Sequence, residues 1–502
     1  MAETPTTTDR AAETPALTGL EPQGCWRHFE LLTRLARPSR HEEPAIEHVR
    51  AWARGHGFEV RQDAARNLVV RVPATSGREW APTVVLQGHL DMVCERLPDS
   101  LNDPAEGRIE LVREGDWLTA DGTTLGADNG IGIAAMMALA DDDSVPHGPL
   151  ELLMTVVEEV GGAGEGVNGL DPSLVTGSIL LNLDSEEDGR LTVGSAGSTD
   201  TSILASKPRE ACPTGTVTLS VSVSGGLGGH SGTDIARGHS NAIKVLVRAL
   251  RETLAAVPFR LVSLDGGKSW NAIPRDAVAI CSLPTEREGE FRAAVDTAAT
   301  TIRDAYAQTD PGVTPAVADA ADAVDAWTEA ATAELLDLVT VVPSGPLAMS
   351  PDFDGLVETS TSLGTAVTDA AGLTLHHMSR SSNGSALPEV LATLDAAARL
   401  AGGSFEVQQS DPAWRPALDS PTLAAVRRVY ERLFGEPPIV TAVHAWLETA
   451  VIGEKVPGLD MVSFGPQIEA PHSPDERVSI PTVERFWRLL VGVVDEQSAA
   501  TT

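Results

Sequence analysis

The sequence predicts an α/β protein in which a main domain is split along the chain by an inserted α+β domain. Up to about residue 205, short apolar runs alternate with helical segments, and the pattern then changes. After Gly403, helical segments and an apolar strand follow again. The insertion of about 190 residues is close to the size of one or two domains. We therefore expect a disordered tail at 1–22, the main domain at 23–210 and 404–502, and the inserted domain at 211–403.

The first part of the main domain is expected to contain buried strands and one long helix. Residues 67–72, 83–87, 151–157 and 178–182 are apolar or β-branched runs bounded by turn residues, which is typical of strands. Runs that are apolar on both faces indicate strands inside an α/β sheet. Residues 130–140 are rich in Ala, Met and Ile and predict a helix.

The inserted part begins with a strand of a different kind. Residues 216–224 carry apolar side chains at every second position, which predicts a half-exposed strand. The remaining expected elements of the insertion and of the returning main domain are helices at 242–255, 290–307, 388–400, 422–433 and 483–494, and strands at 278–282 and 460–464.

Composition excludes several classes of partner. The 502 residues include 37 Lys and Arg against 71 Asp and Glu, a net charge of −34 that disfavours binding to nucleic acid or anionic lipid. We find no apolar run of about 18 residues that could span a membrane and no basic, then apolar, secretory signal. The four scattered cysteines form no Cys-x-x-Cys pair, which indicates a reducing cytoplasm.

Acidic and histidine-containing motifs follow the predicted strands or open the predicted helix. They are QGHLDMV at 87–93, GADNG at 126–130, TVVEEVGG at 155–162, LNLDSEE at 181–187 and APHSPDE at 470–476. Open α/β sheets bind ligands at such strand ends. Singly, Asp128 could cap a helix and His89 could be a structural histidine. Together, two histidines with several carboxylates and no cysteine indicate a hydrolytic zinc or manganese centre.

In this order, the motifs resemble those of the di-zinc metallopeptidase family that includes carnosinases, aminoacylase and succinyl-diaminopimelate desuccinylase. Within that family they are most similar to the bacterial aminoacyl-histidine dipeptidases. This narrower resemblance rests on GGLGGHSG at 225–232, NAIP at 271–274, and MSPD at 349–352 leading to GLVETS at 355–360. It covers residues 25 to 497 and implies a di-zinc peptidase-like catalytic domain whose insertion is a lid.

The resemblance implies a pair of divalent metal ions, with zinc as the expected metal and manganese or cobalt as alternatives. One ion would bind His89, Asp184 and a bridging Asp128. The other would bind Glu159, His472 and the same Asp128. The resemblance also implies a cis peptide bond between residues 128 and 129.

Three further residues receive catalytic roles from the resemblance. Glu158 would be the general base, and the alternation of side chains along a strand would direct it away from its neighbour Glu159. Asp91 would orient His89. His230 would donate a hydrogen bond to the tetrahedral oxygen, although its glycine neighbours also fit a simple turn.

Substrate binding requires a cation, because a dipeptide ends in a carboxylate. Arg380 matches an arginine of the lid in related enzymes, with Asn241 as its partner; the alternative is an exposed arginine without a role. Glu448 would pair with the substrate ammonium, or would be a glutamate on a helix surface. Trp446 stands where related dipeptidases usually have glycine, which places the strict preference for histidine in question.

We therefore expect a cytoplasmic metallodipeptidase that cleaves Xaa-His and related dipeptides, β-Ala-His included. The alternatives are an N-acyl amino acid deacylase with the same metal centre and a non-catalytic relative that binds peptide or metal. The inserted domain is long enough for one chain to build the site with its own His230, and a homodimer is the alternative.

Overall fold

The computed structural model describes residues 14–160 and 164–499 and divides the chain into two compact units. Unit 1 comprises Met1–Val193, Ala417–Thr441 and Val451–Thr502, and unit 2 comprises Gly194–Pro416 and Ala442–Ala450. The expected boundaries at 210/211 and 403/404 differ from this division. The reason is that β9 (Gly197–Ala205) and β21 (Ser404–Asp411) pair with each other in the sheet of unit 2.

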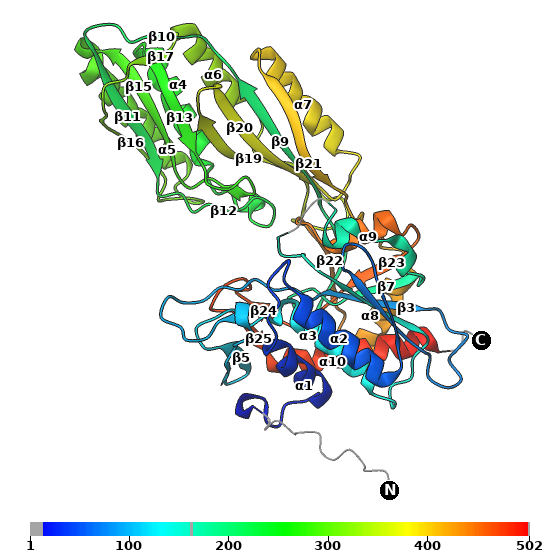
Figure 1. Ribbon diagram of the computed structural model, residues 1–502. Helices are drawn as coiled ribbons and strands as arrows, with labels where there is room; N and C mark the ends of the chain where they lie inside the picture. The colour runs from blue at the N-terminus through cyan, green and yellow to red at the C-terminus, as the bar shows by residue number, and fades with distance from the viewer. Residues whose placement is uncertain (1–13, 161–163, 500–502) are drawn as a thin grey trace. The chain divides into compact units, whose positions relative to one another are not determined.

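Unit 1 is built around a mixed eight-stranded sheet, so the α/β class is confirmed (Figure 1). The inner strands β6, β3, β7 and β23 run parallel to one another, while the outer strand pairs β1–β2 and β2–β6 are antiparallel. In sheet order the strands are β1 (Glu59–Gln62), β2 (Leu68–Val72), β6 (Leu150–Thr155), β3 (Val84–His89), β7 (Ile179–Asn182), β23 (Asp460–Ser463), β8 (Arg190–Ser195) and β22 (Ile439–Val443).

Helices pack around this sheet, and the most deeply buried of them carries the GADNG motif. This helix, α3 (Ala127–Asp141), is apolar on all sides because its Ala, Met and Ile side chains are buried throughout. A small sheet of β24 (Ile468–Glu469), β25 (Arg477–Ser479), β5 (Trp117–Ala120) and β4 (Leu111–Glu114) carries the PHSPDE motif. The other helices are α1 (Gln23–Thr33), α2 (Glu43–His56), α8 (Pro421–Phe434) and α10 (Ile480–Ser498), while α9 (Glu448–Lys455) begins in unit 2 and ends in unit 1.

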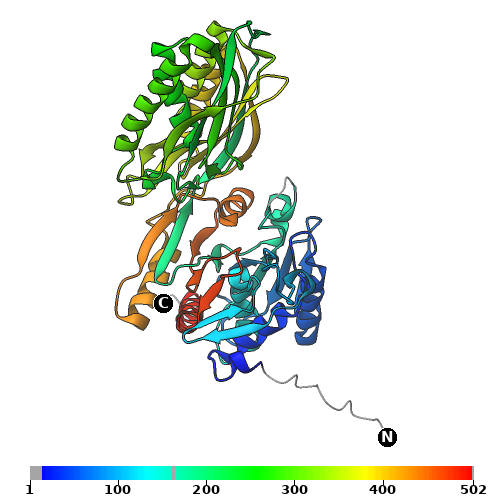
Figure 2. The ribbon, with the colours of Figure 1, turned by 90° about the vertical axis from the view of Figure 1, so that its left-hand side faces the viewer.

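Unit 2 is an antiparallel nine-stranded sheet with helices packed on its apolar face (Figure 2). Alternate residues of β11 (Thr216–Ser224) are buried, which confirms the half-exposed strand. The helices are α4 (Ala242–Ala256), α5 (Glu288–Ala305), α6 (Glu329–Val341) and α7 (Leu387–Leu400). The other strands of the sheet are β13 (Arg260–Gly266), β15 (Ala277–Pro284), β16 (Thr314–Asp319), β18 (Gly345–Met349), β19 (Val357–Thr368) and β20 (Leu373–Ser381).

The N-terminal segment is more ordered than the sequence predicts. Residues 1–13 of the expected tail lie outside the described part of the chain. The rest of the expected tail is structured, because Pro15–Leu17 form a short 3-10 helix and Leu17 and Leu20 are buried. None of the helices in the described ranges combines the length and the apolar character needed to cross a membrane.

Candidate metal centre and catalytic site

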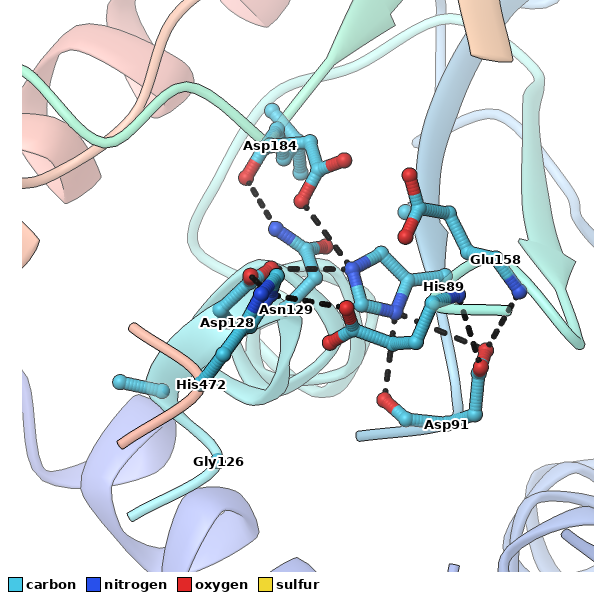
Figure 3. Close-up of polar contacts among 12 residues, drawn as sticks. His89, Asp91, Gly126, Asp128, Asn129, Glu158, Asp184 and His472 are labelled. Carbon is cyan, nitrogen blue, oxygen red and sulfur yellow. Dashed lines mark hydrogen bonds and ion pairs between the residues drawn. The ribbon is translucent and has the colours of Figure 1, made fainter. Parts of the chain in front are cut away.

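Three neighbouring parallel strands of unit 1 deliver three of the five predicted ligands, and the predicted base Glu158, to one edge of the sheet. His89 is the last residue of β3, Asp184 follows the end of β7, and Glu158 and Glu159 lie in a turn after β6. Because β6, β3 and β7 are adjacent and parallel, their carboxyl ends meet at the same place. Figure 3 shows Asp184, Asp128 and His472 on one side of the His89 ring and Glu158 and Asp91 on the other.

The first predicted ligand group is assembled around the imidazole of His89. Its Nε2 atom lies 2.9 Å from Asp128 Oδ1 and 3.4 Å from Asp184 Oδ1. One potential ligand atom from each of the three residues lies within 4.8 Å of the others. Asp128 sits near the start of α3 with a non-helical backbone, and the peptide bond to Asn129 is cis, as predicted.

The second predicted group shares Asp128 with the first. His472, in the turn between β24 and β25, places Nε2 3.3 Å from Asp128 Oδ2 and 2.8 Å from Glu159 Oε2. The two oxygens of Asp128 therefore face different histidines, which is the arrangement expected of a bridging carboxylate. Potential ligand atoms of His89, Glu158 and Glu159 also come within the same 4.8 Å limit.

Asp91 contacts more than the histidine it was predicted to orient. Its two carboxylate oxygens accept hydrogen bonds from the backbone N–H groups of Glu158 (3.1 Å) and Glu159 (3.2 Å). His89 Nδ1 lies 3.1 Å from the main-chain oxygen of Asp91 and 3.6 Å from its carboxylate. The Asp91 side chain therefore mainly fixes the turn that carries the two glutamates, and its main chain makes the closer contact with His89.

The Glu158–Glu159 segment is a turn rather than the end of a strand. Because β6 ends at Thr155, strand alternation does not separate the two side chains, and the argument based on it is wrong. Val157 instead adopts a positive φ of 60°, which is unusual for a β-branched residue. The buried carboxylate of Glu42 accepts the Val157 N–H at 3.1 Å and helps to hold this conformation.

The carboxylates of the cluster favour the protonated, positively charged form of both histidines. Hydrogen bonds to Asp128 and Glu159 raise the pKa of His472 to about 11. Burial opposes charge on His89, but Asp184 and Asp128 outweigh it and hold the His89 pKa well above its ordinary value. Burial also raises the pKa of Asp184 to about 6. A cluster that retains protons so strongly is one that cations stabilise.

The residues present fit a pair of divalent cations of the zinc, manganese or cobalt class. Both groups offer imidazole nitrogen and carboxylate oxygen without cysteine, which is the ligand chemistry of catalytic rather than structural sites. Asp184 Oδ1 is buried, and its contact with His89 Nε2 is long, at 3.4 Å, because that nitrogen lies closer to Asp128. A cation between these groups would give the Asp184 oxygen a shorter and stronger partner.

In unit 2, the predicted His230 and Arg380 lie side by side. His230, in β12 (Gly229–His230), accepts N–H groups from Gly232 (3.3 Å) and Thr233 (3.2 Å) at its Nδ1 atom. Arg380 Nη2 lies 3.4 Å from the other ring nitrogen, Nε2. His444 belongs to the same cluster, because its main-chain oxygen closely approaches Gly232. The arginine is 5% exposed, so the alternative of an exposed arginine is wrong.

Burial sets the protonation of this second cluster. It lowers the pKa of His230 to about 4, with Arg380 adding to the effect, and lowers the pKa of Arg380 to about 10. His230 is therefore neutral near pH 7. Because its Nδ1 atom accepts hydrogen bonds, the single ring proton resides on Nε2, beside the guanidinium.

The surroundings of the two other predicted substrate-binding residues, Asn241 and Glu448, are also defined. The side chain of Asn241 caps α4: Oδ1 accepts N–H groups of Ile243 and Lys244, and Nδ2 donates to Leu363 O and Ser344 Oγ. An amide has no further capacity beyond these four bonds, so a substrate-binding role does not fit. Glu448 begins α9 but is buried, so the alternative of a glutamate on a helix surface is wrong.

The structure also reveals site residues that received no role from the sequence. Glu476 and Arg37 are buried charged residues that hydrogen-bond the backbone around Asp128 and Asp91. Glu476 was visible only as the last letter of the PHSPDE motif. Arg37 lies outside every motif, and no local pattern distinguished it from the other arginines.

Comparison with known proteins agrees with this geometry. A family model described as peptidase family M20/M25/M40 matches residues 85–496. The cytosol non-specific dipeptidase of Escherichia coli (strain K12) is 36% identical over 480 residues, which cover 96% of this chain and 99% of that protein. The crystal structure of aminoacylhistidine dipeptidase from Vibrio alginolyticus matches with a TM-score of 0.86 and 35% identity, covering 95% of this chain and 97% of that chain.

A more distant structure shares the fold alone. Aminopeptidase PepT from Bacillus cereus has a TM-score of 0.54 at 15% identity, covering 96% of this chain and 100% of that chain. The family model and the two near matches confirm the family resemblance and the fold class that the motifs indicated, and the distant structure agrees with the fold.

Proposed function

Because the chain belongs to peptidase family M20/M25/M40, we propose that it is a metal-dependent dipeptidase that hydrolyses Xaa-His and related dipeptides. The observation that carries the proposal is the pair of ligand groups that share Asp128, with Glu158 beside them. Its relative from Escherichia coli is named a cytosol dipeptidase, and we expect the same compartment for this chain.

The chemistry is divided between the metal ions and Glu158. His89, Asp184 and Asp128 would hold one ion, and Glu159, His472 and Asp128 the other, with zinc as the expected metal and manganese or cobalt as alternatives. When bound, such ions lower the pKa of water and polarise a carbonyl group. The Glu158 carboxylate accepts the proton of the attacking water and then donates it to the leaving amine.

His230 and Arg380 provide the complementary, anion-binding part of the proposal. His230 Nε2 and Arg380 Nη2 are both hydrogen-bond donors and lie 3.4 Å apart, an arrangement that an anion accepting from both would stabilise. Arg380 Nε is buried without a hydrogen-bond partner among the described residues. In the proposal, His230 donates to the oxygen of the tetrahedral intermediate, and Arg380 binds the carboxylate terminus of the dipeptide.

A substrate comparison tests the reaction class. We expect the purified chain, supplied with zinc, manganese or cobalt in turn, to cleave β-Ala-His and a panel of Xaa-His dipeptides. N-acetyl-His, which lacks the free amino group, should remain intact. Cleavage of the acetyl compound alone would replace the dipeptidase with a deacylase, and the absence of any hydrolysis under all three metals would favour a binding protein.

The same proposal places His230 in the chain that binds the substrate. Mixing a His230→Ala chain with a Glu158→Gln chain tests this assignment, because each variant retains the residue that the other lacks. We expect the mixture to remain as inactive as its components. Recovery of activity would show instead that two chains of a homodimer share one site.

A further inference from the structure

One buried carboxylate, that of Glu476, binds the backbone that leads into the bridging Asp128. Glu476 Oε2 accepts the N–H groups of Leu125 (2.8 Å) and Gly126 (2.9 Å), and Oε1 accepts those of Ala127 (2.8 Å) and Asp128 (3.4 Å). Its side chain is 2% exposed. Glu476 is also four residues from His472, so it connects the loops of two ligands that are far apart in the sequence.

A buried guanidinium binds the same backbone from the other side. Arg37 Nη2 donates to Gly126 O at 2.6 Å, and Nη1 donates to Leu90 O and Asp91 O at 3.0 Å each. Arg37 is fully buried. Because Leu90 and Asp91 follow directly after His89 and Gly126 precedes Asp128 by two residues, the guanidinium connects the His89 loop with the Asp128 loop.

Two glycines near Asp128 leave the space that the guanidinium of Arg37 occupies. Gly126 has a φ of 71°, and a Cβ atom added to it would collide with Arg37 Nη2. A Cβ atom at Gly130 would lie 2.9 Å from the same nitrogen. The two glycines of the GADNG motif thus allow close approach of the guanidinium, in addition to any freedom they give the backbone.

We propose that Arg37 and Glu476 form a clamp that positions Asp128 between the two ligand groups and thereby sets the affinity for both metal ions. The clamp grips one residue, Gly126, at its carbonyl through Arg37 and at its N–H through Glu476. Neither side chain is among the predicted ligands, so both are positioning residues. This inference rests on the proposed metal-dependent function.

The physical reason is the geometry that a bridging carboxylate requires. Asp128 must present one oxygen to each ion, and a rotation of its backbone would move both oxygens at once. Residues that orient a ligand from behind typically change metal affinity or activity by about 10–100-fold when they are replaced. We expect the clamp to act on this scale.

Metal binding to the full chain tests the clamp directly. Cobalt(II) is titrated into the chelator-treated wild type and the Glu476→Gln variant, and affinity and the visible absorption spectrum are recorded. The amide keeps the size of the side chain but replaces one acceptor oxygen with a donor that faces N–H groups. We expect about 10–100-fold weaker cobalt binding and an altered spectrum.

Glu469→Gln is the matched control, because Glu469 lies in the same hairpin as His472 but pairs with Arg477 at the surface. It should leave both affinity and spectrum unchanged. Arg37→Lys attacks the clamp from its other side, since a lysine cannot reproduce the fork that reaches three carbonyl oxygens. Because both clamp residues act on Gly126, the double variant should lose less than the product of the two single losses.

Wild-type cobalt affinity and spectrum in folded Glu476→Gln and Arg37→Lys variants would overturn the inference. Circular dichroism identifies a variant that does not fold, and Glu476→Asp, which retains the charge, then takes its place: partial recovery of affinity is expected, and full wild-type affinity despite the shorter reach would contradict the clamp. Hydrolysis is measured separately. A wild type that binds two cobalt ions but cleaves no dipeptide would overturn the proposed function and leave the clamp standing.

Discussion

The histidines of the two candidate sites, one in each unit, lie in opposite electrostatic surroundings. In unit 1, hydrogen bonds to the carboxylates of Asp128 and Glu159 raise the pKa of His472 to about 11. In unit 2, burial and the neighbouring Arg380 lower the pKa values of His230 and His444 to about 4. The cluster of unit 1 therefore favours cations, and the cluster of unit 2 combines a neutral and a cationic hydrogen-bond donor, in line with the anion-binding role proposed for it.

Because of this difference, the net charge of the whole chain does not describe the local charge at each site. The value of −34 describes the whole chain and argues against polyanionic partners. It does not describe the surroundings of Arg380, whose guanidinium is buried beside a neutral histidine. A buried guanidinium of this kind offers a local cation to a small anion even in a chain whose net charge is strongly negative.

The largest expected effect is a loss of catalysis in unit 1 without a loss of metal binding. Glu158→Gln removes the proposed general base and should lower kcat by about 10²–10⁴-fold, the usual contribution of such a group. Metal content should stay at two ions per chain, because Glu158 is absent from both groups that share Asp128. Steady-state kinetics and metal analysis measure the two effects, and retained turnover would remove Glu158 from the mechanism.

The next effect tests the anion-binding character of unit 2. Arg380→Ala should raise KM for dipeptides by about 10–100-fold, because a hydrogen bond to a charged group contributes about 1.5–3 kcal/mol. A dipeptide amide, which lacks the terminal carboxylate, provides the control. The wild type should bind the amide poorly, and the variant should treat acid and amide alike. If the variant still prefers the acid, another group binds the carboxylate.

A smaller effect concerns the stability of unit 2 in acid. Burial lowers the pKa of His377 to about 3, with Lys244 and His376 adding to the effect, and its two ring nitrogens have no hydrogen-bond partner among the described residues. In the folded state, His377 is therefore held in its neutral form. Its contribution to stability is complete above the unfolded pKa of about 6.5 and is lost as pH falls towards 3.

The free energy of unfolding should fall by about 2 kcal/mol between pH 6.5 and pH 5 from this residue, since one pKa unit corresponds to about 1.4 kcal/mol. Chelator-treated protein is used, so that loss of metal does not contribute. Denaturant unfolding at both pH values should show a shallower fall in His377→Leu. His376→Leu, which changes the neighbouring and half-buried ring, is the control and should keep the wild-type pH dependence in this range.

The motifs could be recognised because each stands next to a predicted strand or helix end, and strand ends are where open α/β sheets bind ligands. The family resemblance, not the strand pattern, indicated which of their residues would be ligands, and the structure brings those residues together in two candidate groups. The clamp could not be predicted, because Glu476 binds residues that are 348 to 351 positions away in the sequence. Glu476 contacts backbone N–H groups, so the residue types of the donors give no sign of these contacts in the sequence.

Asn241 marks a different kind of limit. An Asn directly before the helix expected at 242–255 is an N-cap signal, and the structure shows that cap. The family resemblance suggested a substrate contact at the same position, and that contact stays a prediction. The strands β9, β19 and β20 were also missed, because their many Ser and Thr residues lack an apolar pattern.

The smallest expected effect separates these two interpretations of Asn241. Asn241→Ala should lower the free energy of unfolding by about 1 kcal/mol, the usual cost of losing an N-cap, and should leave KM unchanged. Thr328→Ala is the matched control, because Thr328 caps α6 in the same unit through the Ala331 N–H and has no proposed contact with substrate. Denaturant unfolding and dipeptide kinetics should give the same pattern for both variants. A rise in KM for Asn241→Ala alone would return this residue to the substrate site, and unit 2 would then bind the dipeptide through a neutral amide as well as through its arginine.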